Sequence, residues 1–256
     1  FTAFHFFVIP PPFTSATLAA SIRAVRDADT IISQVPPLLT QAKLSREQKM
    51  ILFRYLVHVV GDVHQPLHIG NGFDRGGNLC SVKWTNPATK IIEDTNLHTV
   101  WDEKIIENIA YDFRKTITVA VGEKRWFGYK EFGDMVLSDP QDFATVSSAK
   151  VSDWFDESQR LHKEVYPDGG VSVKPSERAY CKAQDEKTNS KFDVSKIPTL
   201  DSAYVQGSIP IVKKRVLFAG YRLAGIINKI AESAPLKGRT LTDDMRALEA
   251  ITLKNQ

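Results

Sequence analysis

Cysteine is scarce in this sequence, since its 256 residues include only Cys80 and Cys181. Because the two form no Cys-x-x-Cys pair, the sequence argues against a zinc–thiolate site. They could form one long-range disulfide in an oxidising compartment, or they could be two buried free thiols. The sequence alone leaves both interpretations open.

Long apolar runs and a strong charge of one sign are also missing. No stretch approaches the roughly 20 apolar residues of a transmembrane helix, so we expect no membrane span. The formal net charge of +3 is too small to indicate a polyanion-binding surface by itself. With 43% hydrophobic and 25% charged residues, the composition is that of an ordinary globular protein of one domain.

Helical patterns account for most of the chain. Ser45 to Gln48 has the Ser-x-x-Gln form of a capping box, and it opens an apolar-rich helix that reaches about Val63. Further helices are predicted over about 15–35, ended by Pro36 and Pro37, and over about 97–110, 151–166 and 203–233. Residues 79–84 and 90–93 could pair as a hairpin. We therefore predict one all-α, multi-helix domain over residues 1–256 with a small β-hairpin.

Histidines and aspartates are concentrated in the middle of the sequence. His58 and Asp62 are four residues apart on one predicted helix, as are His98 and Asp102 on another. Residues at this spacing share a helix face. His68 follows just after Pro66 interrupts the first helix. Together these side chains offer imidazole nitrogens and carboxylate oxygens, which are ligands suited to zinc.

A surface ion pair is the simpler explanation for any single His-x-x-x-Asp spacing. The first pair, however, lies among the apolar residues 55–61, where a buried histidine and aspartate without partners would be unfavourable. Metal ligation removes that cost, and a second pair of the same spacing follows. The pattern therefore predicts a metal site.

These residues resemble a known family. Residues 53–68, FRYLVHVVGDVHQPLH, are similar to the signature of the zinc-dependent class I nucleases, the single-strand-specific nuclease and 3'-nucleotidase family. The resemblance continues through DRGGN at 74–78, NLH at 96–98, WD at 101–102, and AGYRLA at 219–224 with Asn228. His5, before a run of three prolines, resembles another histidine of the family.

The resemblance implies a trinuclear zinc cluster in a mostly helical fold shared with bacterial zinc phospholipases C. By motif position, one zinc ion would be held by His5, His58 and Asp62, with Asp62 bridging to a second ion. Another zinc ion would be held by His68, His98 and Asp102.

Further roles follow from the same resemblance. Asp62 and Asn78 are the implied catalytic residues, and Asn78 would approach the substrate phosphate or the attacking water. Phe6 would bind substrate by stacking on a base, the alternative being a plain core aromatic. His64 is interpreted as a supporting or structural residue, and His162 as an ordinary helix residue.

The implied activity is the hydrolysis of single-stranded DNA and RNA to 5'-mononucleotides, with 3'-nucleotides as further substrates. Family members place a tryptophan, a histidine and an aspartate before the equivalent of His5. We therefore expect residues 1–256 to be a nuclease domain lacking its N-terminal segment, and three zinc ions in the full-length protein. We expect the protein to be secreted or periplasmic, because the family binds zinc through an amine freed by signal-peptide removal. We also expect a monomer.

Three alternatives differ in function. A zinc phospholipase C would use the same scaffold, but its last helix pair ends in glutamate where this chain has Asp102. The Gly-Gly-Asn loop at 76–78 also favours the nuclease. A degenerate zinc-binding homologue without catalysis stays open. A di-iron carboxylate protein would use Glu-x-x-His, a spacing that these pairs do not follow.

Overall fold

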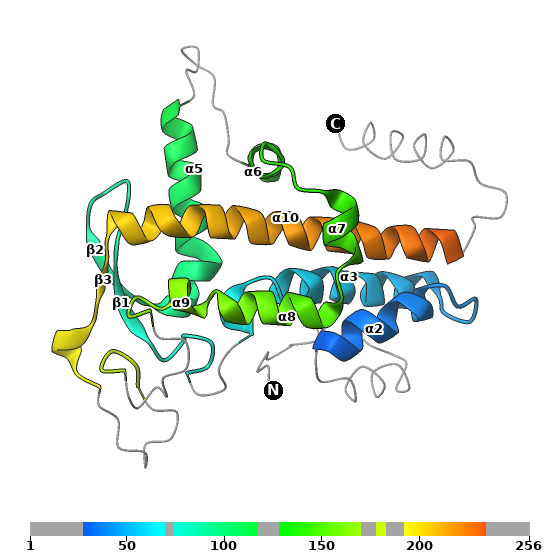
Figure 1. The fold of residues 1–256 in the computed structure, drawn as a ribbon, viewed down its shortest axis with the longest axis horizontal. Helices are drawn as coiled ribbons and strands as arrows, with labels where there is room; N and C mark the ends of the chain where they lie inside the picture. The colour runs from blue at the N-terminus through cyan, green and yellow to red at the C-terminus, as the bar shows by residue number, and fades with distance from the viewer. Residues whose placement is uncertain (1–27, 70–73, 117–127, 170–177, 183–191, 234–256) are drawn as a thin grey trace.

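A computed structural model describes residues 28–69, 74–116, 128–169, 178–182 and 192–233 (Figure 1). This part of the chain is mostly helical with one small sheet, which confirms the predicted fold class. The helices are α2 (Ala28–Leu39), α3 (Arg46–Asp62), α4 (Leu97–Thr99), α5 (Ile105–Thr116), α6 (Tyr129–Leu137), α7 (Phe143–Ser148), α8 (Val151–Arg160), α9 (His162–Val165) and α10 (Ser202–Ser233). Short 3-10 turns form η1 (Pro66–His68) and η4 (Val194–Lys196), and a π-helical turn, η2 (Val100–Lys104), links α4 to α5.

The start of α3 has the predicted capping box. Ser45 Oγ accepts a hydrogen bond from the Gln48 amide at 3.2 Å, and Gln48 Oε1 accepts one from the Ser45 amide at 2.9 Å. These bonds satisfy two amides that a helix N-terminus otherwise leaves without partners. The helix then runs to Asp62, where a metal ligand was predicted.

Helix α2 departs from the sequence prediction. It continues through Pro36 and Pro37 to Leu39, so the prediction that these prolines end the helix is wrong. The prolines remove two backbone donors, but only two residues of the helix follow them, so the disruption is confined to its end. Buried Ile32 and Val35 belong to the same hydrophobic cluster as the buried face of α3, and this packing stabilises the helix. The predicted start near residue 15 lies outside the described residues.

The sheet places the second His–Asp pair. Strand β1 (Ser81–Thr85) pairs antiparallel with β2 (Ile92–Asn96), which confirms the hairpin, and β3 (Thr199–Leu200) adds a short parallel pairing on the other side of β1. Asn96 ends β2 and caps α4, because its Oδ1 accepts from the Thr99 amide at 2.8 Å. The helical segment carrying His98 and Asp102 therefore starts directly at the sheet.

Helix α10 runs along most of the molecule (Figure 1) and packs against α2, α3, α5, α6 and α7. Its first half contributes Val205 and Val212 to a core that includes the sheet and α5. Its second half packs Leu223 and Ile226 on a second core, between α2 and α3. Of the helices that the structure describes, none combines the length and apolarity of a membrane span.

A buried charge network joins α10 to α8. Glu157 pairs with Arg222, whose Nη2 lies 2.7 Å from Oε1, and with Arg215, which donates to Oε2. The side chain of Arg222 is only 1% exposed and that of Arg215 only 6%. Burial would raise the pKa of Glu157, but the bonds from Arg222 and Arg215 lower it. The network thus holds one carboxylate against two desolvated cations.

Replacing Glu157 with glutamine should destabilise the fold strongly. The variant E157Q leaves two buried guanidinium groups without their counter-charge, a change that typically removes about 3–5 kcal/mol from the free energy of unfolding. Urea unfolding followed by circular dichroism measures the loss. The neighbouring pair of Asp156 and Arg160 is exposed and 3.9 Å apart, so D156N should change stability by less than about 1 kcal/mol. Equal effects of the two variants would contradict this account.

The two cysteines form a disulfide, which decides the question left open by the sequence. It joins residues 101 positions apart and lies beside an antiparallel bridge in which the Lys182 amide donates to the Leu79 carbonyl at 2.9 Å. The crosslink ties the 178–182 segment to the start of the sheet.

Reduction of the disulfide should lower the stability of the fold. For a closed loop of this length the chain-entropy model gives about 4–5 kcal/mol. Urea unfolding with and without a phosphine reductant measures the difference. A variant with both cysteines replaced by alanine should match the reduced protein and respond no further to reductant. A reduced protein as stable as the oxidised one would refute the expectation.

Candidate metal centre

The turn after α3 carries two predicted ligands, Asp62 and His68, one at each end. Two buried carbonyl groups of this turn, just beyond the end of α3, accept side-chain hydrogen bonds. Ser158 Oγ donates to the Val63 carbonyl at 2.6 Å, and Arg215 Nε donates to the His64 carbonyl at 3.0 Å. These bonds from α8 and α10 satisfy the carbonyls away from water and hold the turn in place.

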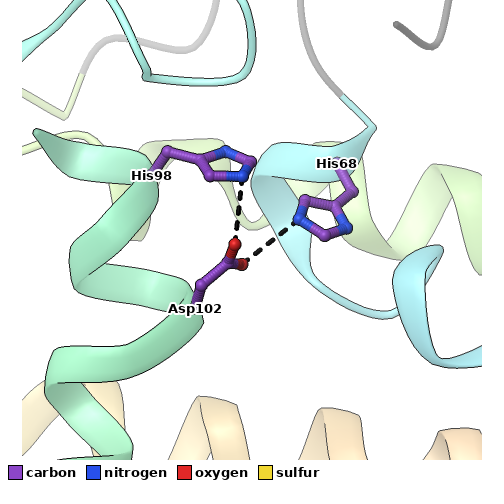
Figure 2. A group of neighbouring side chains, drawn as sticks. All are labelled: His68, His98 and Asp102. Carbon is purple, nitrogen blue, oxygen red and sulfur yellow. Dashed lines mark ion pairs between the residues drawn. The ribbon is translucent and has the colours of Figure 1, made fainter. Parts of the chain in front are cut away.

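Five predicted ligands form one continuous chain of contacts. His58 Nε2 lies 3.2 Å from Asp62 Oδ2, and Asp62 Oδ1 lies 3.5 Å from His68 Nδ1. The contacts continue through Asp102, whose Oδ1 is 3.2 Å from His68 Nε2 and whose Oδ2 is 3.1 Å from His98 Nε2. Figure 2 shows His98 and Asp102 on one helical segment, with His68 entering from the neighbouring turn.

The subset His68, His98 and Asp102 is the tightest. One ligand atom from each lies within 4.8 Å of the others. The π-helical turn η2 contains Asp102, and such turns, in which the helix is locally widened, are frequent at functional sites. The structure therefore brings together the three residues predicted to share one zinc ion.

The hydrogen bond on the far side of His98 defines which nitrogen faces the cluster. Its Nδ1 lies 2.8 Å from the Gly76 carbonyl oxygen, which can only accept, so Nδ1 carries a proton. In the neutral ring Nε2 then has a lone pair directed toward Asp102. This arrangement is stable when a cation lies between them, and histidines that bind metals commonly have such a carbonyl partner.

The carboxylates make the site strongly attractive to a cation. Burial alone would lower the pKa of His68, but Asp102 and Asp62 outweigh it and raise the value to about 9. Burial would likewise raise the pKa of Asp102, whereas His68, His98 and Gln65 hold it well below its usual range. Two carboxylates thus stabilise positive charge between them.

The donor set fits a divalent metal. Among the described residues, the buried Asp62 Oδ2 accepts no hydrogen bond of good geometry, although His58 lies beside it as an ion pair. A buried carboxylate oxygen in this state gains from a metal ion. Imidazole and carboxylate ligands suit zinc.

A hollow of about 300 Å³ opens beside the cluster. Its lining includes Asp62, His68 and Asp102 together with apolar side chains of α10 such as Val212 and Val216. A larger groove of about 490 Å³ lies elsewhere, between α2, α3 and α10, but its lining residues include no acid, histidine or cysteine. The smaller hollow is therefore the candidate site for a reaction, because only its lining contains the predicted metal ligands.

The remaining predicted site residues stand differently. Asn78 is exposed, and its Nδ2 donates to the carbonyl of Arg75 at 2.9 Å, within the loop that also carries Gly76. Its role toward the phosphate stays a prediction. His5 and Phe6, predicted for metal and base, lie outside the described residues.

Several supporting residues escaped the sequence analysis. Gln65 Nε2 donates to Asp102 Oδ1 at 2.8 Å, and only its place inside the signature could have indicated this. His162, interpreted as an ordinary helix residue, is buried and donates from Nε2 to the Pro66 carbonyl at 3.0 Å. His64 has a structural role, which is one of the two interpretations given from the sequence. Its Nδ1 donates to Val60 O at 2.6 Å, and Arg222 Nη1 donates to its Nε2 at 2.8 Å.

Comparisons with known proteins agree with the site. A family model described as S1/P1 Nuclease matches residues 3–232. Endonuclease 4 of Arabidopsis thaliana is 31% identical over 181 residues, which cover 71% of this chain and 50% of the relative. Endonuclease 1 of the same plant is 28% identical over 188 residues, or 69% and 48%. Nuclease S1 of Aspergillus oryzae is 26% identical over 219 residues, or 82% and 62%. The chain thus spans about half the length of the plant relatives it matches.

The pH dependence of stability should reflect the buried His64. Burial, and then Arg215, lowers the pKa of His64 to about 3, whereas an unfolded chain has a histidine pKa of about 6.5. Between these values the unfolded state binds more protons, so the free energy of unfolding falls as the pH decreases from about 6.5 toward 3. The residue contributes at most about 1.4 kcal/mol per pH unit.

Urea unfolding at several pH values, in the presence of a chelator, measures this dependence. The variant H64Q lacks the titrating group, so its stability should fall less steeply below pH 6.5 than that of the parent protein. Parallel curves for the two proteins would show that His64 does not titrate in this way.

Proposed function

Because the chain belongs to the S1/P1 nuclease family, we propose that it hydrolyses phosphodiester bonds of single-stranded DNA and RNA with the help of zinc. The observation that carries the proposal is the cluster of His68, His98 and Asp102, linked through Asp62 to His58. The proposed products are 5'-mononucleotides, and 3'-nucleotides are proposed as further substrates. We also propose a secreted or periplasmic monomer, with which the disulfide is consistent.

The metal ligands divide into two groups. His68, His98 and Asp102 would hold one zinc ion, and His58 with Asp62 would take part in a second site, to which His5 is also assigned. Three ions are proposed for the full-length protein. When bound, zinc supplies a Lewis acid that lowers the pKa of a coordinated water toward about 7 and offsets charge on a phosphoryl oxygen.

The chain's own residues orient the reactants. Asp62 lines the hollow, where its carboxylate would accept a proton of the attacking water. Gln65 fixes Asp102, and the Gly76 carbonyl fixes His98. In the proposed hydrolysis the water oxygen bonds to phosphorus, the P–O3' bond breaks, and the 3'-oxygen leaves with a proton.

Preference for single strands has a physical reason. An unpaired base is free to stack on an aromatic side chain, a contact worth about 1–3 kcal/mol per base. Phe6 is the proposed partner for such a base, and Asn78 the proposed contact to the phosphate. Both assignments come from the family motif.

Zinc content tests the proposal. After purification with zinc, elemental analysis should find bound zinc in the parent chain, and D102N should bind it more than roughly 100-fold more weakly, because a direct ligand is lost. Asp94 is exposed on β2 outside the cluster, so D94N should retain wild-type affinity. Cleavage of single-stranded DNA should follow the same order and stop on addition of a chelator.

Two outcomes would contradict the proposal. Absence of zinc from the parent chain after zinc-replete purification would remove the metal site and the mechanism that depends on it. Hydrolysis of phosphatidylcholine in place of single-stranded DNA would assign the site to a zinc phospholipase C.

A further inference from the structure

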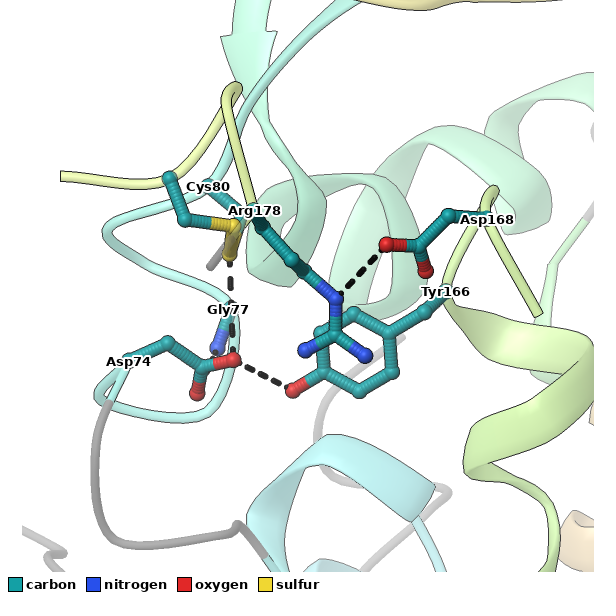
Figure 3. The surroundings of a disulfide bond; sticks show 7 residues. Asp74, Gly77, Cys80, Tyr166, Asp168 and Arg178 are labelled. Carbon is teal, nitrogen blue, oxygen red and sulfur yellow. Dashed lines mark hydrogen bonds and ion pairs between the residues drawn. A yellow bond between two sulfur atoms is a disulfide. The ribbon is translucent and has the colours of Figure 1, made fainter. Parts of the chain in front are cut away.

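A buried polar cluster lies around the disulfide (Figure 3). At its centre is Asp74, which is fully buried. Its Oδ1 accepts from the Gly77 amide at 3.1 Å, and its Oδ2 accepts from the Tyr166 hydroxyl at 2.6 Å. A buried carboxylate needs such bonds to offset its desolvation. Asp74 is thus held by its own loop and by a residue far along the chain.

Tyr166 is itself fixed from the other side. The guanidinium carbon of Arg178 lies 3.9 Å from the centre of its ring, and Arg178 Nε donates to Asp168 Oδ2 at 2.9 Å. Burial and the Asp74 carboxylate keep the pKa of Tyr166 well above its usual range, so the hydroxyl remains a donor. The disulfide anchors Cys80, at the opposite end of the 74–80 loop.

The middle of this loop reaches the candidate metal centre. Gly76 has φ 61°, and a Cβ at this position would lie 2.4 Å from the Leu67 carbonyl oxygen. The loop therefore packs directly on the turn that carries His68. The Gly76 carbonyl accepts from His98 Nδ1 at 2.8 Å. A displacement of the loop would turn the His98 ring away from Asp102.

The short helix α9, which directly precedes Tyr166, contacts the other two segments that carry predicted ligands. His162, at the start of α9, donates to the Pro66 carbonyl in the turn that ends at His68. The Val165 carbonyl, at the end of α9, accepts from the Tyr204 hydroxyl. That hydroxyl accepts from Trp101 Nε1 at 2.8 Å, and Trp101 precedes Asp102. Tyr166 follows α9 directly, so one turn of helix is connected to all three segments.

We propose that α9 with Tyr166 is the positioning element of the metal centre. Its three hydrogen-bonded connections, through Pro66, Asp74 and Tyr204, set the relative places of His68, His98 and Asp102. The hydrogen-bond partners Pro66, Asp74 and Tyr204 are not themselves proposed metal ligands, so α9 and Tyr166 act through the segments that they hold. The inference rests on the proposed function only in that the cluster binds a metal.

The variant Y166F tests the central connection, because it removes one hydroxyl and keeps the ring under Arg178. Two measurements are made on the full 256-residue chain. The first, without metal, is the exchange rate of the His98 Nδ1 proton, observed by ¹⁵N-histidine NMR. The second is the zinc affinity, measured by competition with a chromophoric chelator. We expect faster proton exchange and roughly tenfold weaker zinc binding, the lower end of the range for outer-shell residues.

A matched control is Y221F. Tyr221 is a half-buried tyrosine of α10 whose ring packs edge-on against Phe143, outside the cluster around Asp74. This variant should leave both measurements unchanged at a temperature where both proteins are folded. A second variant, W101F, removes the donor to Tyr204 and should weaken zinc binding without altering the His98 proton.

The outcomes separate the two proposals. Wild-type proton exchange in Y166F would overturn the positioning role, whatever the zinc result. Altered exchange with unchanged zinc affinity would overturn it as well, since the ring would move without consequence for the metal. Failure of the parent chain to bind zinc would overturn the proposed function, and this inference about a metal centre with it, even if the proton measurement showed that Tyr166 orients His98.

Discussion

The buried turn that follows α3 imposes the main constraint on this structure. Here the chain leaves the helix, and the carbonyl groups of Val63, His64 and Pro66 point into the protein, where water cannot satisfy them. Side chains from α8, α9 and α10 supply the missing donors: Ser158, His162 and Arg215. Each bond removes a desolvation penalty, and together they allow the chain to turn sharply between Asp62 and His68. The candidate metal centre depends on that turn.

The two sides of the turn show opposite electrostatic arrangements. Behind it, Glu157 balances the guanidinium groups of Arg215 and Arg222, and hydrogen bonds hold all three in place. In front of it, Asp62 and Asp102 face imidazoles in contacts that favour an added cation. The charges of Glu157, Arg215 and Arg222 are thus paired with one another, whereas the cluster of Asp62 and Asp102 favours an added cation. This contrast is what a metal site at the cluster would require.

Much of the candidate metal centre could be predicted from the sequence because its determinants are local. The pairs His58/Asp62 and His98/Asp102 follow helix spacing, and the capping box at Ser45 marks the start of the first helix. These signals require only the geometry of one helix at a time. The hairpin was predictable because its two strands are close together in the sequence.

The supporting residues could not be predicted, since their roles exist only in three dimensions. Tyr166 meets Asp74 across 92 positions and Arg222 meets His64 across 158, and no local pattern encodes such partners. The continuation of α2 through two prolines depends likewise on packing against α3, which overrides local preference. The two-residue strand β3 is too short to leave a pattern.

The candidate metal centre combines a compact sequence motif with supporting groups from distant parts of the chain. The predicted ligands that the structure describes all lie between residues 58 and 102, so their motif is compact in sequence. Apart from Gln65 and the Gly76 carbonyl, the groups that hold them lie between residues 157 and 222, on α8 and α10 and around α9. The ligand segment alone would leave buried carbonyls of its central turn without donors, at a cost of about 1–3 kcal/mol each. The geometry of the centre is therefore a property of the folded domain, and residues remote from the ligands can change it.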